Sequence, residues 1–306
     1  MIRIDLITGF LGAGKTEFMK RYARWLMKRG LRVGILVNDC GAVNVDMLLL
    51  RELEEEGCGL HMVAGACDAD CHRRRFKSKL IAMGMSGYDR VLVEPSGVFD
   101  VDEFFDALCE EPLDRLYERG SVITVADACL EDDLPESADY LLASQLADAG
   151  VVVLSKTQLT TAEARERTLR RMEEALLRIK CGKELRPYLL DKDWDTLTDE
   201  DFERVMNSGC DMRSFVKRGT TDDSGFRSAY LLNKGFTVEE LEEYTRKAFE
   251  NDAEGRVFRV KGFVRRDGGW MEFNATRQGT TLAPVKEAQD VVIVVSVPAG
   301  DDRKVK

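Results

Sequence analysis

One segment near the amino end of the chain reads Gly9-Phe10-Leu11-Gly12-Ala13-Gly14-Lys15-Thr16 and fills every position of the pattern GxxxxGK[ST]. An apolar run at residues 2–8 precedes it, and a helical pattern begins near Lys15. This order of strand, loop and helix is typical of a phosphate-binding loop. Successive backbone N–H groups of such a loop surround a phosphate, and the positive end of the helix dipole points at the anion. We therefore expect nucleotide binding by Gly9, Gly12, Ala13, Gly14, Lys15 and Thr16.

Two side chains of this loop are expected to act on a triphosphate directly. The ammonium group of Lys15 reaches the oxygens of the β- and γ-phosphates, and the hydroxyl of Thr16 is placed to bind Mg²⁺. The sequence therefore predicts a nucleoside triphosphate as the ligand and Mg²⁺ as its cofactor.

The composition is that of an acidic globular protein. The 306 residues suffice for about two domains, each large enough to bury a core. A formal charge of -10 and a pI of about 5.0 argue against nucleic acid, or an anionic membrane surface, as a partner held by general electrostatics. The basic triplet at residues 73–75 is too short to reverse that balance. Apolar runs stay far below the ~18 residues of a membrane span, so we expect no membrane partner.

Cysteine usage indicates a reducing compartment. The chain holds 8 Cys residues, and Met1 leads almost at once into the first apolar run. We therefore expect a cytoplasmic protein without a signal peptide. Thiols in the cytoplasm indicate metal or redox chemistry before structural disulfides.

Apolar, β-rich runs alternate with helical ones along much of the chain. We expect strands at residues 31–37, 90–94, 121–126 and 151–155, and helices at residues 15–29 and 162–180. A capping box at residues 160–163 opens the second helix. Such alternation predicts an α/β fold with a mainly parallel, doubly wound sheet covered by helices on both faces. Ligands of such sheets bind at the carboxyl ends of the strands, where the phosphate loop already lies.

A second, smaller domain is expected after a charged region that contains Asp and Gly residues. The alternating pattern breaks down from about residue 183. We place the phosphate-loop domain at residues 1–200, a linker at residues 201–225 and an α+β domain at residues 226–306. Within the last, we expect strands at 226–232, 257–264, 270–274 and 291–297, and a helix at 238–251 opened by the box Thr237-Val238-Glu239-Glu240.

Two acidic residues at predicted strand ends are candidates for catalysis. The segment Glu94-Pro95-Ser96-Gly97 follows an apolar run. In phosphate-loop enzymes a carboxylate at this place holds Mg²⁺, and a glycine N–H can sense the γ-phosphate. Asp39 ends another strand and is aimed at Mg²⁺ or the attacking water, so we assign Lys15, Asp39 and Glu94 as catalytic and Gly97 as a nucleotide contact. A surface carboxylate or a turn is the commoner explanation of any single one, but their occurrence at successive strand ends favours nucleotide hydrolysis.

Another strand end carries Ser155-Lys156-Thr157-Gln158, which looks like the guanine-reading motif [NST]KxD with one change. The stem of Lys156 is expected to lie along the base, and position 158 to face the edge of the base. A carboxylate there accepts both N–H groups of guanine, whereas a glutamine amide is complementary to adenine. We therefore expect Ser155, Lys156 and Gln158 to contact the base, with a weakened preference for GTP and tolerance of ATP.

These motifs together resemble those of the CobW/HypB/UreG family of metal-related GTPases, and more narrowly its CobW-like branch. The likeness rests on the phosphate loop, on residues 37–46, which are similar to that branch's NEFGExxxD segment, and on residues 94–97, which are similar to its ExSG. It continues through residues 122–128 and 145–156, and residues 256–263 resemble the family's RxKGF strand. The likeness implies slow GTP hydrolysis coupled to delivery of a transition metal, Zn²⁺ or Co²⁺ above all, to a client metalloprotein. Relatives often pair when nucleotide is bound, so it also implies a nucleotide-dependent homodimer.

The main departure from that branch concerns its GCxCC segment. The aligned stretch here is Gly65-Ala66-Cys67-Asp68-Ala69-Asp70-Cys71-His72, with two thiols at a different spacing. Residues 58–72 still hold five of the chain's 8 Cys and 2 His residues, namely Cys58, His61, Cys67, Cys71 and His72. Thiolates and imidazoles so concentrated can bind Zn²⁺ or Co²⁺ tetrahedrally. We expect Cys67 and Cys71 as ligands, joined by His72 or Cys58; the alternative leaves Cys58 in a turn and His61 within a strand.

The expected chemistry is one of positioning and electrostatics. No arginine can be assigned to stabilise the transferred phosphoryl group, so turnover is expected on the order of 10⁻² s⁻¹ or below. Loss of the γ-phosphate is expected to reshape the cysteine segment and release its metal. Two other functions could use the same loop, a phosphoryl-transfer kinase and a non-catalytic metal- or corrinoid-binding adaptor. The intact Lys15, Thr16 and Glu94 argue against the adaptor.

Overall fold

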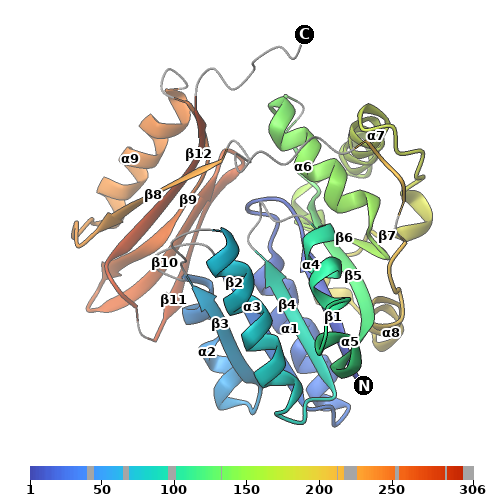
Figure 1. Cartoon of the computed structure of the whole chain (residues 1–306). Coiled ribbons are helices and arrows are strands. Elements are labelled where there is room, and N and C mark those ends of the chain that lie inside the picture. The colour runs from blue at the N-terminus through green and yellow to red at the C-terminus, as the bar shows by residue number, and fades with distance from the viewer. Residues whose placement is uncertain are drawn as a thin grey trace. The chain divides into compact units, whose positions relative to one another are not determined.

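The structure is a computed structural model and describes residues 1–39, 45–64, 69–95, 101–131, 133–211, 213–216, 226–251, 255–286 and 288–298. The chain divides into two compact units, Met1–Leu134 with Ala138–Arg218, and Pro135–Ser137 with Gly219–Lys306. Each unit contains one sheet, which Figure 1 shows with its helices. In the described part of the chain, no helix combines the length and the apolar character that crossing a membrane requires.

The first unit is built on a sheet of seven parallel strands in the order β3-β2-β4-β1-β5-β6-β7. Its strands are β1 (Ile2–Thr8), β2 (Val33–Asp39), β3 (Gly59–Ala64), β4 (Arg90–Pro95), β5 (Tyr117–Asp127), β6 (Val151–Ser155) and β7 (Leu189–Leu190). All six neighbouring pairs run parallel. The carboxyl ends of the strands therefore lie along one edge, as the sequence predicts.

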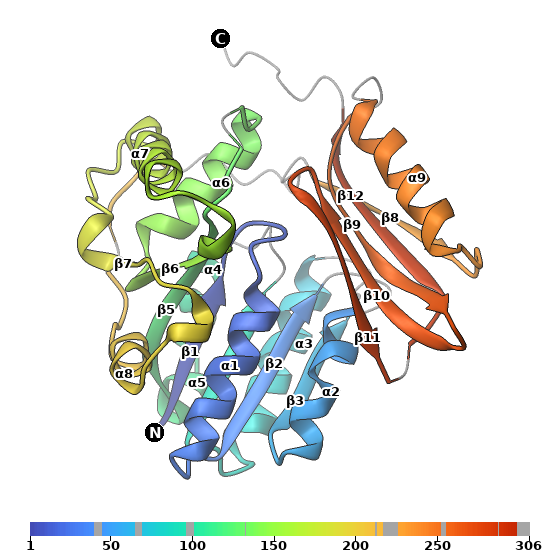
Figure 2. The ribbon, with the colours of Figure 1, turned by 180° about the vertical axis from the view of Figure 1, so that it is seen from behind.

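Helices cover both faces of this sheet (Figures 1 and 2). They are α1 (Lys15–Lys28), α2 (Val45–Glu55), α3 (Ala69–Gly84), α4 (Val101–Leu108), α5 (Leu113–Leu116), α6 (Glu136–Ala147), α7 (Ala162–Arg178) and α8 (Asp199–Met206), with short 3-10 turns η1 (Thr157–Leu159), η2 (Arg186–Tyr188) and η3 (Trp194–Thr196). One buried cluster joins α1, α2 and α8 to the sheet, and a second joins α3, α4 and α5 to it. The predicted doubly wound α/β class is confirmed.

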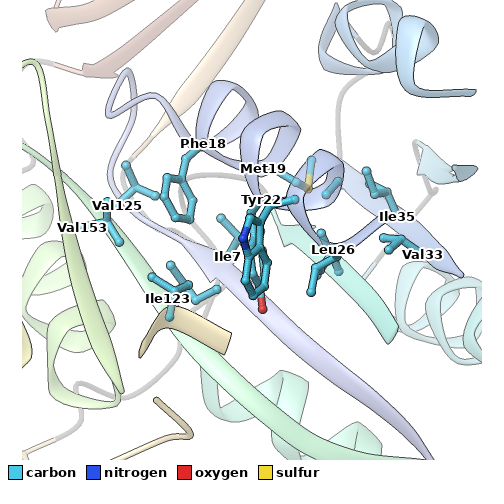
Figure 3. Packing of buried hydrophobic residues seen from close by; sticks show 14 of the residues in the cluster. Ile7, Phe18, Met19, Tyr22, Leu26, Val33, Ile35, Ile123, Val125 and Val153 are labelled. Carbon is cyan, nitrogen blue, oxygen red and sulfur yellow. The ribbon is translucent and has the colours of Figure 1, made fainter. Parts of the chain in front are cut away.

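Helix α1 is anchored by apolar residues at helical spacing. Phe18, Met19, Tyr22 and Leu26 are fully buried and recur every three to four positions, so they form one stripe along the helix. Figure 3 shows this stripe packed against Ile7 of β1 and against neighbouring strands. Burial of each such side chain stabilises the fold by about 1.5–3 kcal/mol. The stripe therefore holds the amino end of α1 at the carboxyl end of β1.

The second strand lies further along the chain than predicted. The prediction placed it at residues 31–37, whereas β2 spans Val33–Asp39 because its last two residues continue the ladder with β3. Asn38 pairs with Val63, and Asp39 pairs with Ala64. Asp39 is therefore part of the strand itself, at its last position.

Helix α8 extends the first unit beyond residue 200. Its Phe202 and Val205 are buried in the same cluster as α1, and a capping box of Thr198 and Asp201 opens it. The guanidinium group of Arg90 donates to the carbonyl oxygen of Met206, at the end of the helix, at 3.3 Å. The linker predicted at residues 201–225 therefore begins inside a packed helix.

Over its described residues, the second unit is an antiparallel sheet with one helix. The strand order is β11-β10-β9-β12-β8, formed by β8 (Arg227–Leu232), β9 (Gly255–Arg266), β10 (Gly269–Thr276), β11 (Gly279–Val285) and β12 (Val291–Pro298). Helix α9 (Val238–Glu250) is opened by the predicted box of Thr237 and Glu240 and packs Leu241 into the core of the unit. The predicted α+β class of this part is confirmed.

Candidate nucleotide-binding site

The turn between β1 and α1 has three glycines with positive φ, at positions 9, 12 and 14. Gly9 has φ +145°, and a Cβ atom there would lie 2.1 Å from the carbonyl oxygen of Val125 on β5. Gly14 has φ +93° and is the residue that precedes α1. Side chains other than hydrogen are disfavoured in this left-handed region. The conformation of the loop therefore depends on the glycines that the motif specifies.

Lys15 lies buried at the centre of this loop. Its ammonium nitrogen donates to the carbonyl oxygen of Gly9 at 3.0 Å, and the side chain is 7% exposed. Lys15 is also the first residue of α1, a helix of 14 residues. The positive charge of the lysine and the positive end of the helix dipole therefore lie together. Both attract anions. The loop therefore has the electrostatics that a phosphate group requires.

Thr16 and Glu94 meet at the mouth of the loop. The hydroxyl of Thr16 donates to Oε1 of Glu94 at 2.9 Å, and Glu94 is 4% exposed near the end of β4. A hydroxyl and a carboxylate are hard oxygen ligands of the kind that Mg²⁺ prefers. These two predicted ligands come from segments far apart in the sequence, and the fold places them in contact.

Two further predicted residues are only partly covered by the structure. Asp39 ends β2, and the pairing of Val37 with Glu94 and of Asn38 with Pro95 sets that end beside β4. The side chain of Asp39 and the whole of Gly97 lie outside the described residues. Their predicted roles remain predictions.

The end of β6 holds the segment predicted to read the base. Ser155 is buried, and its hydroxyl donates to the carbonyl oxygen of Ala126 at 3.3 Å. Lys156 adopts φ +58°, and its ammonium group donates to Oδ2 of Asp127 at 2.5 Å. Gln158 is exposed on η1. Asp127 was not assigned to the site from the sequence, although it follows directly after a predicted strand.

A second residue at this site was missed by the sequence analysis. The ring of Trp194 lies beside the phosphate loop, since a Cβ atom on Gly14 would be 3.2 Å from its Cη2 atom. Its indole N–H donates to the carbonyl oxygen of Leu154, on β6, at 2.8 Å. The only available signal was an aromatic residue within the charged run at residues 191–195.

Cys58 lies apart from the other predicted metal ligands. It precedes β3 and is 3% exposed, and its thiol donates to the carbonyl oxygen of Val33 at 3.3 Å. Burial raises the pKa of this thiol to about 12, which disfavours the thiolate form that binds metals. The next ligands follow the opposite end of β3, a six-residue strand that spans roughly 20 Å. Burial and separation along β3 therefore argue against Cys58 as a metal ligand, and its predicted role stays a prediction.

His61 lies in a strand and contacts a tyrosine side chain. It lies within β3, as the alternative interpretation expected, and its Nε2 atom is 2.9 Å from the hydroxyl of Tyr88. The two rings meet edge to face with their centroids 5.8 Å apart. His61 is therefore held against a neighbouring side chain.

Two of the predicted metal ligands begin α3. Cys71 and His72 are the third and fourth residues of the helix, and both are half-buried. Burial lowers the pKa of His72, so its ring is neutral at pH 7 and able to bind a metal. Cys67 lies outside the described residues. Within the part of the chain that the structure describes, no three His, Cys, Asp or Glu residues form a group able to hold a metal ion.

Comparisons with known proteins agree with this geometry. The family model described as CobW/HypB/UreG, nucleotide-binding domain, matches residues 3–186. The chain is 28% identical over 167 residues to the zinc chaperone YeiR of Escherichia coli (strain K12), which covers 54% of this chain and 50% of YeiR. It is 23% identical over 187 residues to zinc-regulated GTPase metalloprotein activator 1 of Schizosaccharomyces pombe, which covers 59% of this chain and 44% of that protein. The chain thus spans about half the length of the curated relatives that it matches.

A solved structure can be aligned over nearly the whole chain. The crystal structure of the Zn(II)-bound YjiA GTPase from E. coli is 15% identical to it, with 97% of this chain and 94% of that chain covered and a TM-score of 0.37.

Proposed function

This chain belongs to the CobW/HypB/UreG family, and we propose that it binds GTP with Mg²⁺, hydrolyses GTP slowly and couples hydrolysis to the transfer of a transition metal to a client protein. The contact that carries the proposal is the 2.9 Å hydrogen bond between Thr16 and Glu94, beside the buried Lys15. Three groups that a triphosphate and its metal need are thereby gathered at one place. Zn²⁺ is the first cargo to test, because two relatives are named for zinc, with Co²⁺ as the second.

The loop and Lys15 would bind the phosphates. The backbone N–H groups of the loop and the ammonium of Lys15 surround the β- and γ-phosphate oxygens and stabilise the charge that develops on them during cleavage. Thr16 and Glu94 are the residues that would hold Mg²⁺, which supplies positive charge to the same oxygens when bound. These interactions lower the barrier by positioning and electrostatics.

Two residues are proposed to act at the γ-phosphate. Asp39, at the end of β2, orients the attacking water, and the N–H group of Gly97 contacts the γ-phosphate. The support for Asp39 is its strand, since the ladder sets the end of β2 beside that of β4, near Glu94. Turnover is expected on the order of 10⁻² s⁻¹ or below, as in switch GTPases that act without an added arginine.

The cargo metal is proposed to bind at the start of α3. Cys67, Cys71 and His72 are the proposed ligands, and both β3 and β4 end at the same edge of the sheet. The segments that follow these strands are the cysteine segment and the one that carries Gly97. Loss of the γ-phosphate can therefore change the ligand geometry and weaken metal binding.

Nucleotide binding and hydrolysis are tested together. The protein is titrated by calorimetry with GTP and with ATP in the presence of Mg²⁺, and phosphate release is followed without any acceptor molecule. We expect binding of GTP and slow phosphate release, and we expect Thr16→Ala to abolish the Mg²⁺ dependence. Thr161→Ala, which removes the cap hydroxyl of α7, is the matched control. Failure to bind either triphosphate overturns the proposal, and release that requires an acceptor favours a kinase.

Coupling to metal is tested by comparing nucleotide states. The Kd for Zn²⁺ is measured on anaerobically purified protein with a non-hydrolysable GTP analogue and with GDP. We expect tighter binding in one state and loss of the difference in a Cys67→Ala/Cys71→Ala variant. Cys109→Ala, at an exposed cysteine after α4, is the control. Equal affinities in both nucleotide states rule out the coupling.

A further inference from the structure

Trp194 contacts three parts of the proposed nucleotide site at once. Its ring lies beside Gly14, at 3.2 Å and 3.6 Å from the place of a Cβ atom there. The same ring meets that of Phe18, in α1, edge to face with the centroids 5.4 Å apart. Its indole N–H donates to the carbonyl oxygen of Leu154 at 2.8 Å. One side chain therefore joins the phosphate loop, the helix after it and the strand that leads into Ser155 and Lys156.

The turn that carries Trp194 is itself attached to α1. The guanidinium group of Arg21 donates to the carbonyl oxygen of Trp194 at 3.2 Å and to Oδ1 of Asp195 at 2.8 Å. The carboxylate of Asp193 caps η3 by accepting the N–H of Asp195 at 3.0 Å. Contacts on both the backbone and the ring therefore set the position of the indole.

Gly14 is a position in the loop where such a contact restrains the backbone. Its left-handed conformation begins α1, and its carbonyl oxygen accepts the N–H of Phe18 at 3.0 Å. Glycine has the largest conformational freedom of any residue, so holding it in one conformation has an entropic cost. A ring packed beside Gly14 restricts that freedom before a ligand binds. Phosphate binding then requires less ordering of the loop.

We propose that Trp194 is a positioning residue that holds the phosphate loop ready for the nucleotide and links it to the base-reading strand end. The proposal rests on the proposed nucleotide binding, and it concerns a residue outside every loop motif. Because the ring supports Gly14, its loss weakens the binding of the phosphates whatever the base. The hydrolysis rate at saturation stays nearly unchanged, since Trp194 touches none of the proposed catalytic groups Lys15, Asp39 and Glu94 among its described contacts.

The test compares Trp194→Leu with Trp25→Leu. Trp25 also lies in the first unit and donates its indole N–H to Asp199, but it packs on α8. Both variants lose an indole ring that packs in the same core cluster, buried for Trp25 and half-buried for Trp194, so both lose stability. For Trp194→Leu we expect the Kd values of GTP, GDP and inorganic tripolyphosphate to rise about tenfold each, with kcat within twofold of the wild type. For Trp25→Leu we expect all three Kd values to stay within twofold.

A second measurement tests the role of Trp194 without removing its side chain, so the result does not depend on the stability of a Trp194 variant. In the Trp25→Phe/Trp270→Phe protein, Trp194 is the remaining tryptophan, so its fluorescence reports on the loop directly. We expect tripolyphosphate alone to change the emission of Trp194. Unchanged Kd values in Trp194→Leu, or an emission that no phosphate alters, overturn the role of Trp194 while nucleotide binding by the wild type leaves the proposed function intact. A wild-type protein that binds no nucleotide overturns both.

Discussion

The phosphate loop and the cysteine segment lie at the same edge of one sheet but are built in opposite ways. At the phosphate loop the groups are already in contact, since Thr16 meets Glu94 at 2.9 Å and Lys15 is buried against the loop backbone. The candidate metal ligands are instead spread along the chain, with Cys58 before β3 and with Cys71 and His72 at the start of α3.

This difference has a physical basis. Oxygen ligands of a nucleotide-bound Mg²⁺ share their metal with phosphate groups, so the protein needs to supply only one or two of them on a rigid frame. A tetrahedral site for a transition metal takes most of its ligands from the protein. Such ligands often reach their final positions only when the metal binds. The first site is expected to respond to substitution of single residues, and the second to loss of a thiol and to the nucleotide state.

The largest effect is expected for Lys15→Ala. Removal of the ammonium group from a buried anion site should raise the Kd for GTP and lower kcat/KM by about 10²- to 10³-fold, as loss of one preorganised donor does elsewhere. The measurement is calorimetry together with phosphate release. Lys20→Ala, on the same helix but engaged with Glu17 and Glu52, should behave as the wild type. Equal losses in both variants would assign the effect to folding of α1.

A smaller effect is expected for Glu94→Gln. The amide keeps the size of the side chain and can still bond to Thr16, but it lacks the charge that favours Mg²⁺. We expect kcat to fall about 100-fold, a loss that higher Mg²⁺ concentrations partly restore, while GDP binding without Mg²⁺ is unchanged. Titration of activity against Mg²⁺ is the measurement. An unchanged Mg²⁺ requirement would mean that Glu94 supports Thr16 only by hydrogen bonding.

Comparing the thiols of Cys71 and Cys58 tests which of the two cysteines binds the metal. Cys71→Ala should weaken Zn²⁺ binding about tenfold or more, because one of few soft ligands is lost. Cys58→Ala should leave the Kd for Zn²⁺ unchanged and instead lower the free energy of unfolding, since it removes a side chain from the core cluster around α1 and α2. Competition with a chromogenic chelator measures the first, and urea denaturation the second. A weakened Kd in Cys58→Ala would return that residue to the metal site.

The parts that a contiguous pattern encodes were predictable from the sequence. The phosphate loop, the parallel sheet and the capping box before α9 follow from short motifs and from periodicity, and the structure has them. Before α7 the structure has a single cap, in which the side chain of Thr161 accepts the N–H of Ala164, instead of the box predicted at residues 160–163. Strand β11 was missed because it is an edge strand whose residues are mostly exposed and include Pro284, so it lacks the apolar alternation of a buried strand.

The parts that depend on tertiary contact were not predictable in this way. Trp194 reaches the candidate nucleotide site from η3, after β7, and Asp127 reaches it from the last position of β5. No motif in the sequence marks either residue. The prediction of Cys58 as a metal ligand has the converse weakness. Five Cys and His residues within residues 58–72 form a cluster in the sequence, but an extended strand separates the first of them from the last. Closeness along the chain implies closeness in space only where the chain turns back.

The smallest effect concerns the titration of Cys58. Burial raises the pKa of its thiol from 9.0 to about 12, whereas in the unfolded chain the thiol ionises near its ordinary value. Between those two values the unfolded state has lost the proton and the folded state keeps it, so the unfolded state binds fewer protons. Stability contributed by the neutral thiol is complete below pH 9 and falls by about 1.4 kcal/mol for each pH unit above it.

The wild type and Cys58→Ala contain the same other groups that titrate in this pH range. The difference between their free energies of unfolding therefore reports on the Cys58 thiol alone. We expect the stability advantage of the wild type over Cys58→Ala, from urea midpoints, to be constant from pH 7 to pH 8 and to be about 1 kcal/mol smaller at pH 10. An advantage that is independent of pH would show that the thiol ionises as readily in the folded protein as in the unfolded chain. Cys58 would then be an accessible thiolate, the form that binds metal, and the contrast between a core thiol and a ligand thiol at the two ends of β3 would fail.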